Sequence, residues 1–310
     1  MKHSVYQYLI ALSVVTVFGA VTACDEDDDD SNILWGQKSE TIASTDSVQT
    51  TTTISTINYT KRLEVPALKE GNKFYYHSSV EGTDTVMTYC FEYDFSKYHS
   101  RWVAFRFDEI TRPKVVSRKN YEILPKYPHD ELLPTQYIID DDESFNGYDH
   151  GHLCASADRL YSRTANDNTF YMTNMSPQIS SFNQQYWTSF ESYVQTKGRD
   201  ASFSDTLYVV KGGTIDDEEN ILKYVCDNRM PVPKYYYMAL LKVKNNTYSA
   251  MAFLMEHKAY DGSPSTTEMA EKIVSIDELE AFTGIDFFPN LPDVIENVVE
   301  ASVSLSAWGF

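Results

Sequence analysis

The residues of this chain that are best suited to chemistry lie between positions 148 and 191. This stretch contains two histidines, several carboxamides and several acids, all of which need hydrogen-bond partners if they are buried. His152 can accept a proton near neutral pH, because an unperturbed imidazole titrates at about pH 6.5. Asn183 offers a neutral oxygen, which suits a hard cation such as Mg²⁺ that keeps most of its waters.

Glu191 follows Asn183 by two helical turns, a rise of about 12 Å in an α-helix. At this distance we expect Glu191 to hold a water of the cation rather than the cation itself. A neutral histidine beside a hydrated divalent cation is suited to hydrolysing a phosphodiester. The imidazole takes a proton from water, and the cation neutralises the charge that develops on the leaving oxygen.

Hydrophobic periodicity predicts the elements that position these groups. Aromatic residues recur at spacings of four, four and three and predict an amphipathic helix that begins near Asn183; they are Phe182, Tyr186, Phe190 and Tyr193. The segment that ends at Leu153 and runs into small residues is expected to be a short strand or loop.

Elsewhere the pattern predicts an antiparallel sheet. Two hairpins are expected, the second around the Asn245-Asn246 pair, together with a buried strand. The expected strands are 86–94, 102–107, 206–210, 235–243 and 248–256. A helix with a capping start is expected at Ser275. Residues 111–147 are proline-rich and are expected to form a long loop, a kind of segment that often carries function. The predicted fold is α+β, a central antiparallel sheet flanked by helices.

The histidine stretch resembles the DNA/RNA non-specific endonucleases of the ββα-metal (His-Me finger) class. Their motif is Asp-Arg-Gly-His, followed by Thr-Asn-Met-Ser-Pro-Gln and then by Phe-Asn-Gln with a downstream Glu. The chain carries, in the same order, Asp149-His150-Gly151-His152, Thr173 to Gln178, and Phe182-Asn183-Gln184 with Glu191. The resemblance spans about residues 64–310.

The resemblance implies a metal-dependent, sugar-non-specific endonuclease of DNA and RNA with a ββα-metal active site. His152 would be the general base, Asn183 the sole protein ligand of Mg²⁺ (with Mn²⁺ as an alternative), and Glu191 would orient waters of the metal. Asn174 would support the site, and Arg118, upstream in the long loop, would bind the scissile phosphate. A homodimer is left open.

Several alternatives stand beside this interpretation. His150 replaces the arginine of the motif, so a titratable group stands where the family has a fixed cation. His150 and His152 could instead be half of a zinc site, His152 could be a core histidine, Asn174 a turn cap and Glu191 a solvated helix residue. At the level of function, a phosphodiesterase of nucleotides or other small diesters and a catalytically silent surface-binding lipoprotein remain open.

The N-terminal part of the chain predicts export. Residues 1–23 have an apolar run that ends in Val-Thr-Ala before Cys24, as in a lipoprotein signal peptide, so lipid on Cys24 is expected to anchor the chain to a membrane. Residues 24–63 are acidic and then rich in Ser and Thr, and they are interpreted as a tether. The endonuclease-like domain would occupy residues 64–310. The expected location is the bacterial outer membrane, at the cell surface or the periplasmic face.

The net charge of −19 conflicts with nucleic-acid binding, which is driven by neutralising phosphates. Either a local basic groove lies on an acidic body, or binding is weak. Such a groove would use Arg118, Lys119, Arg159 and Arg163. Three cysteines other than Cys24 allow at most one disulfide, and the sequence does not select a pair among Cys90, Cys154 and Cys226.

Overall fold

The structure, a computed structural model, describes residues 58–120, 122, 124–139 and 145–310. The predicted signal peptide, Cys24 and the tether up to residue 57 lie outside the described residues. Within the described ranges, none of the helices combines the length and the apolar character needed to cross a bilayer.

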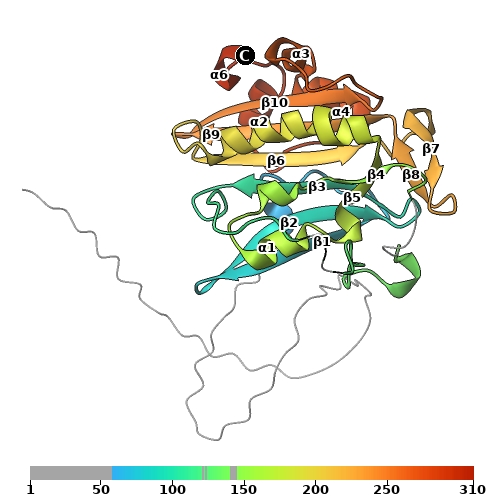
Figure 1. Ribbon diagram of the computed structural model, residues 1–310. Helices are drawn as coiled ribbons and strands as arrows, with labels where there is room; N and C mark the ends of the chain where they lie inside the picture. The colour runs from blue at the N-terminus through green and yellow to red at the C-terminus, as the bar shows by residue number, and fades with distance from the viewer. Residues whose placement is uncertain (1–57, 121, 123, 140–144) are drawn as a thin grey trace, which may run out of the picture. The chain divides into compact units, whose positions relative to one another are not determined.

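A seven-stranded antiparallel sheet forms the centre of the fold, with the strand order β1-β2-β3-β6-β9-β10-β11 (Figure 1). Two small two-stranded sheets, β4-β5 and β7-β8, accompany it. The strands are β1 (Lys73–Glu81), β2 (Asp84–Asp94), β3 (His99–Phe107), β4 (Asp149–His152), β5 (Met175–Gln178), β6 (Thr206–Gly213), β7 (Ile221–Val225), β8 (Met230–Pro233), β9 (Tyr235–Lys244), β10 (Thr247–Glu256) and β11 (Ile273–Val274).

Helices flank the central sheet, as expected for the predicted α+β fold. The α-helices are α1 (Arg163–Asn168), α2 (Thr188–Arg199), α3 (Thr266–Ala270), α4 (Ile276–Thr283), α5 (Asp293–Val299) and α6 (Leu305–Trp308). A π-helix, η5 (Phe182–Trp187), precedes α2. Short 3₁₀ turns are η1 (Tyr59–Lys61), η2 (Thr135–Tyr137), η3 (Ser156–Asp158), η4 (Met172–Asn174) and η6 (Glu218–Asn220).

The inner strands of the central sheet, such as β3 and β9, are buried on both faces along most of their length, which explains why they carry apolar residues at successive positions. Along β3, Val103 and Phe105 join the core that contains Phe190 of α2, while Trp102 joins the opposite core, which contains Leu279 of α4. Successive strand side chains point to opposite faces, so each face needs its own helical cover. Figure 1 shows α2 lying against the sheet.

Both predicted hairpins are confirmed. Strand β2 pairs with β3, and β9 pairs with β10 around Asn245 and Asn246. The φ angles of these two asparagines are +49° and +59°, the left-handed conformation that a tight two-residue hairpin turn requires at both central positions. The capping start of α4 is also present: Ser275 accepts a hydrogen bond from the Glu278 N–H, and the Glu278 side chain accepts one from Ser275 N–H.

The helix expected at residue 182 begins differently from the prediction. Residues 182–187 form a π-helix rather than an α-helix, and regular α-helix starts only at Thr188. The burial pattern is nevertheless the expected one, since Phe182, Tyr186 and Phe190 are all buried. A π-turn inserts an extra residue into the turn, which re-aims the side chains of that turn, and such turns are often found at functional sites.

Two further observations concern points that the sequence left open. The packed chain reaches back at least to Tyr59, whose ring centre lies 4.4 Å from that of Tyr76. The three cysteines Cys90, Cys154 and Cys226 are buried, and none of them forms a disulfide.

Candidate functional site

Strands β4 and β5 place His152 at the end of a short ladder. His150 pairs with Pro177, Gly151 with Ser176, and His152 with Met175. Glycine is required at position 151, because a Cβ atom there would lie 2.2 Å from the side-chain oxygen of Gln178. The close approach of β4 to Gln178 therefore fixes the position of the backbone that carries both histidines.

A cavity of about 540 Å³ lies beside this ladder and is open to solvent. Four of the five residues that the sequence singled out are on its wall, although they come from four different segments of the chain: Arg118, His152, Asn183 and Glu191. The other lining residues are Lys126, Tyr127, Tyr148, Asp149, His150, Ala155, Ser156, Gln184 and Thr188.

His152 is held as a neutral imidazole. The residue is only 9% exposed, and burial, helped by the charges of Arg118 and His150, lowers its pKa to about 3. The ring forms a hydrogen bond with the backbone of His150, whereas Nε2 has no hydrogen-bond partner among the described residues. The bonded atom is therefore Nδ1, and Nε2 keeps a lone pair that can accept a proton.

Asn183 is oriented by Asp149. The Asn183 amide nitrogen donates to Asp149 Oδ2 at 3.0 Å, and the same carboxylate accepts from Ser180 and Gln184. Burial opposes ionisation of Asp149, but these hydrogen bonds outweigh it and lower its pKa. With its nitrogen turned to Asp149, the carboxamide of Asn183 has its carbonyl oxygen left to bind a ligand.

Glu191 belongs to a buried charged group at the cavity wall. Lys211 Nζ lies 2.8 Å from Asp158 and 3.4 Å from Glu191, and the Lys211 side chain is fully buried. Burial raises the pKa of Glu191, and the opposing charge of Lys211 only partly offsets this. Two carboxylates thus share one ammonium group, and Lys211 fixes the position of Glu191.

Asn174 does not line the cavity; it braces the segment that follows His152. Its side chain is fully buried, accepts the Cys154 N–H at 2.8 Å, and donates to the carbonyls of Cys154 at 2.8 Å and Thr169 at 2.7 Å. Asn174 is therefore a positioning residue and does not contact the reacting atoms.

We predict that Asn174→Ala lowers the free energy of unfolding by about 3 kcal/mol, because three backbone groups in a dry interior lose their partner. Urea denaturation compared with wild type measures the change. The control is Asn297→Ala, which removes an exposed carboxamide whose one hydrogen bond to the described residues is to the Asp293 carbonyl. A loss below about 1 kcal/mol would show that Asn174 does not brace this segment.

The predicted basic groove is only partly present. Arg118 lines the cavity, and the charged groups of Arg118 and Lys119 each lie 5.3 Å from the Phe170 ring centre. Arg163 is exposed and bonds to Asp167 and the Ser117 carbonyl. Arg159 was predicted wrongly: it is fully buried, with its guanidinium 4.5 Å from the Phe105 ring centre.

His150 is enclosed by aromatic rings. It stacks between Phe145 and Tyr127, with ring-centre distances of 4.0 and 4.5 Å and interplanar angles of 17° and 7°. Among the residues described, no third metal-ligating side chain joins His150 and His152, so the zinc alternative has no support there.

Several wall residues were not assigned a site role from the sequence, among them Asp149, Lys126 and Tyr127. Asp149 stands in the histidine motif, but its contact with Asn183 depends on the relative placement of β4 and η5. Lys126 and Tyr127 come from the long loop. The sequence indicated a functional role for this loop as a whole but not for these two residues. The position of these side chains on the cavity wall depends on tertiary contacts and could not be predicted from their local sequence.

The residues of the cavity fit a hydrated Mg²⁺ ion. Asn183 supplies a neutral carbonyl oxygen, Asp149 fixes its orientation, and Glu191 supplies a carboxylate on the same wall. Mg²⁺ is commonly held by one or two protein oxygens and several waters, which is the kind of donor set found here.

Comparison with known proteins gives a consistent result. A family model described as DNA/RNA non-specific endonuclease matches residues 69–294. Nuclease C1 of Cunninghamella echinulata var. echinulata is 29% identical over 156 residues, which are 48% of this chain and 60% of that protein. Human mitochondrial nuclease EXOG is 27% identical over 210 residues, 64% of this chain and 55% of that protein. The match thus spans less than two thirds of these two relatives.

Other similar proteins are matched over more of their length. A protein named nuclease from Nostoc sp. is 26% identical over 222 residues, 69% of this chain and 76% of that protein. A crystal structure of an EndoG/EndoGI complex superimposes with a TM-score of 0.57 at 18% identity, covering 71% of this chain and 88% of that one. This structural likeness shows a shared fold.

Proposed function

Because this chain belongs to the DNA/RNA non-specific endonuclease family, we propose that it hydrolyses internal phosphodiester bonds of DNA and RNA with the help of a divalent cation. The observation that supports this most strongly is that His152 and Asn183, which come from β4 and η5, line one cavity. A neutral imidazole and an oriented amide oxygen are thereby brought to the same space.

Four wall residues have a defined task in this proposal. His152 accepts the proton of the attacking water at Nε2, and its Nδ1 contact with the His150 backbone holds the ring in the required tautomer. Arg118 binds the phosphate of the scissile bond through its fixed positive charge. Asn183 would hold Mg²⁺ or Mn²⁺ and Glu191 would orient waters of the cation, and the bound cation would supply charge that stabilises the transition state.

Supercoiled plasmid, RNA and a small model diester, each incubated with and without Mg²⁺, test the proposed substrate class. We expect cleavage of plasmid and RNA at comparable rates and much slower turnover of the small diester, because a long substrate also contacts wall residues other than those that bind the reacting phosphate. Preferential turnover of the small diester would favour a nucleotide phosphodiesterase instead. No turnover with any substrate or cation would favour a binding protein.

The low pKa of His152 makes a prediction about pH. Since burial lowers this pKa to about 3, the imidazole stays neutral and able to accept a proton as the pH falls. We therefore expect kcat/KM to show no loss with an apparent pKa near 6.5 between about pH 8 and about pH 5. Initial rates at saturating Mg²⁺ measure the profile.

The control for this profile is Glu191→Gln, because burial also raises the pKa of Glu191 and could add an inflection of its own. An inflection near pH 6.5 that persists in this variant would contradict the proposed state of His152.

We also propose that the chain is exported and held at the bacterial outer membrane by lipid on Cys24. The support is the sequence before Cys24, which resembles a lipoprotein signal peptide, and the acidic block that follows it. Fractionation of cells that express wild type or Cys24→Ser tests this. Wild type should sediment with membranes and the variant should be released in soluble form; a variant that stays with the membrane would contradict lipid attachment.

A further inference from the structure

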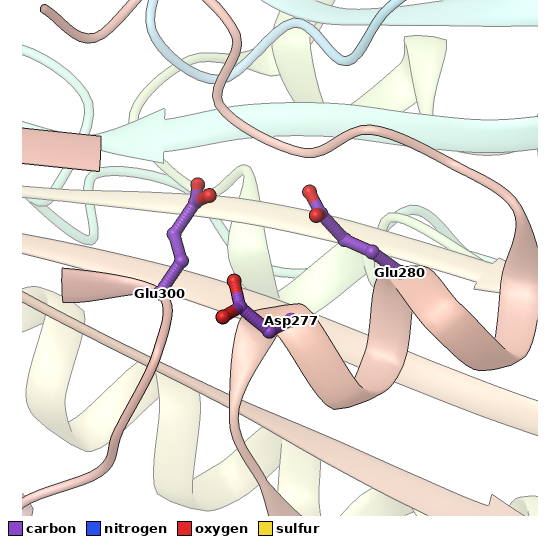
Figure 2. A group of neighbouring side chains, drawn as sticks. All are labelled: Asp277, Glu280 and Glu300. Atoms are coloured by element: carbon purple, nitrogen blue, oxygen red, sulfur yellow. The ribbon is translucent and has the colours of Figure 1, made fainter. Parts of the chain in front are cut away.

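Three carboxylates far apart in the sequence meet outside the cavity described above. Asp277 and Glu280 lie one turn apart on α4, and Glu300 caps the C-terminal end of α5. One oxygen from each lies within 4.8 Å of the others, and Figure 2 shows the three side chains turned toward a common space. The Asp277 N–H donates to the Glu300 carbonyl at 3.2 Å, which holds the two helices in this arrangement.

The three residues differ in exposure in a way that suits a binding site. Asp277 is exposed, Glu280 is half-buried, and Glu300 is only 4% exposed. An entering ion can therefore reach the cluster from solvent at Asp277 and contact a carboxylate inside the protein. None of the three lines the cavity that contains His152.

Glu300 has a buried oxygen without a partner. Its Oε1 atom accepts no hydrogen bond from the described residues, whereas Glu280 accepts the Phe287 N–H at 2.7 Å. No Lys, Arg or His of the described part of the chain forms an ion pair with any of the three carboxylates. Burial and neighbouring carboxylates raise the pKa of Glu300 to about 9.

A buried carboxylate normally has a cation or hydrogen-bond donors beside it, because desolvation otherwise costs several kcal/mol. Here the charges that raise the pKa of Glu300 belong to other acids, which are Glu280, Glu296, Asp277 and Asp286. The missing component is a positive charge, and the side chains present offer only oxygen ligands. Hard divalent cations are bound by such ligands, and Ca²⁺ accepts several carboxylates in flexible geometry, whereas Mg²⁺ dehydrates reluctantly.

We propose that Asp277, Glu280 and Glu300 bind Ca²⁺ at a second cation site, separate from the cavity of His152. A cation there would join α4 to the end of α5 and so hold the C-terminal part of the chain on the sheet face covered by α4. Its role would be structural, because none of the three ligands contacts the wall of the cavity.

The test is thermal unfolding of the full-length chain in detergent, first in EGTA and then with added CaCl₂. Ca²⁺ at about one hundred times its Kd should raise the Tm of wild type by about 5 °C. Glu300→Gln, which keeps the shape and removes the charge, should lose this shift. In EGTA the variant should be at least as stable as wild type, because the repulsion among the acids is relieved.

Two controls separate this site from others. Glu271→Gln makes the same charge change at an exposed position outside the cluster and should keep the full Ca²⁺ shift. Asn183→Ala, at the proposed catalytic cation site, should keep it too. If Glu300→Gln does not fold, the exposed Asp277→Asn gives the same comparison. Absence of a shift in wild type, or an undiminished shift in the folded cluster variants, would overturn the proposal.

Discussion

Replacement of His152 by alanine should reduce the rate of plasmid cleavage by about 1,000-fold, within the range expected for loss of a general base. His152 lines the cavity and its Nε2 atom has no hydrogen-bond partner among the described residues. The ring of His150, the other histidine on that wall, is stacked between two aromatic rings. Initial nicking rates of the variant and wild type at saturating Mg²⁺ measure the effect.

The matched control is His129→Ala, which removes an exposed histidine that does not line the cavity. It should cleave at the wild-type rate. Circular dichroism must show the same folded content for both variants, so that the loss of activity can be assigned to the cleavage reaction and not to unfolding. A His152→Ala protein that keeps full Mg²⁺-dependent activity would show that another group takes the proton.

The second large effect is expected from Asn183→Ala, which should lower cleavage by about 100-fold or more and raise the Mg²⁺ concentration needed for half-maximal rate. The variant loses a carboxamide of η5 that Asp149 orients and whose oxygen is left to bind a cation. Rates measured across a Mg²⁺ titration separate weaker cation binding from a slower reaction at saturation.

Gln185→Ala is a closely matched control for Asn183→Ala. Gln185 is a carboxamide of the same π-helix, but it is exposed and is not on the wall of the cavity. Its removal should leave both the rate and the Mg²⁺ requirement unchanged. Equal effects of the two substitutions would mean that any replacement in η5 lowers activity by disturbing the helix, and that Asn183 has no role as a ligand.

The sequence predicted those parts of the fold that depend on local periodicity and turn chemistry. The β2-β3 and β9-β10 hairpins and the capped start of α4 follow from alternation, from Asn245-Asn246 and from Ser275, and all three are present. The α-helical geometry expected at Phe182 was wrong, because aromatic spacing identifies a buried face but does not distinguish an α-turn from a π-turn.

The candidate site was likewise predictable only in part from the sequence. The spacing of the linked motifs indicated His152, Asn183 and Glu191, which the fold brings to one cavity. The partners of these residues could not be predicted, because they depend on tertiary contacts: Asp149 orients Asn183, and Lys211 lies beside Glu191.

The charge of a residue was the least reliable basis for predicting its place in the fold. Arg159 looked like part of a basic groove, but the local sequence does not reveal that Phe105 and its neighbours enclose it.

The central claim is that this acidic chain is a cation-dependent nuclease whose reaction takes place between His152 and Asn183. Conversion of supercoiled plasmid to nicked and linear forms by the full-length chain, with Mg²⁺ and then with excess EDTA, tests it most directly. We predict rapid conversion with Mg²⁺ and none with EDTA, and recovery when Mg²⁺ is restored. Cleavage that continues unchanged in EDTA, or plasmid that stays intact with Mg²⁺ and with Mn²⁺, would contradict the claim.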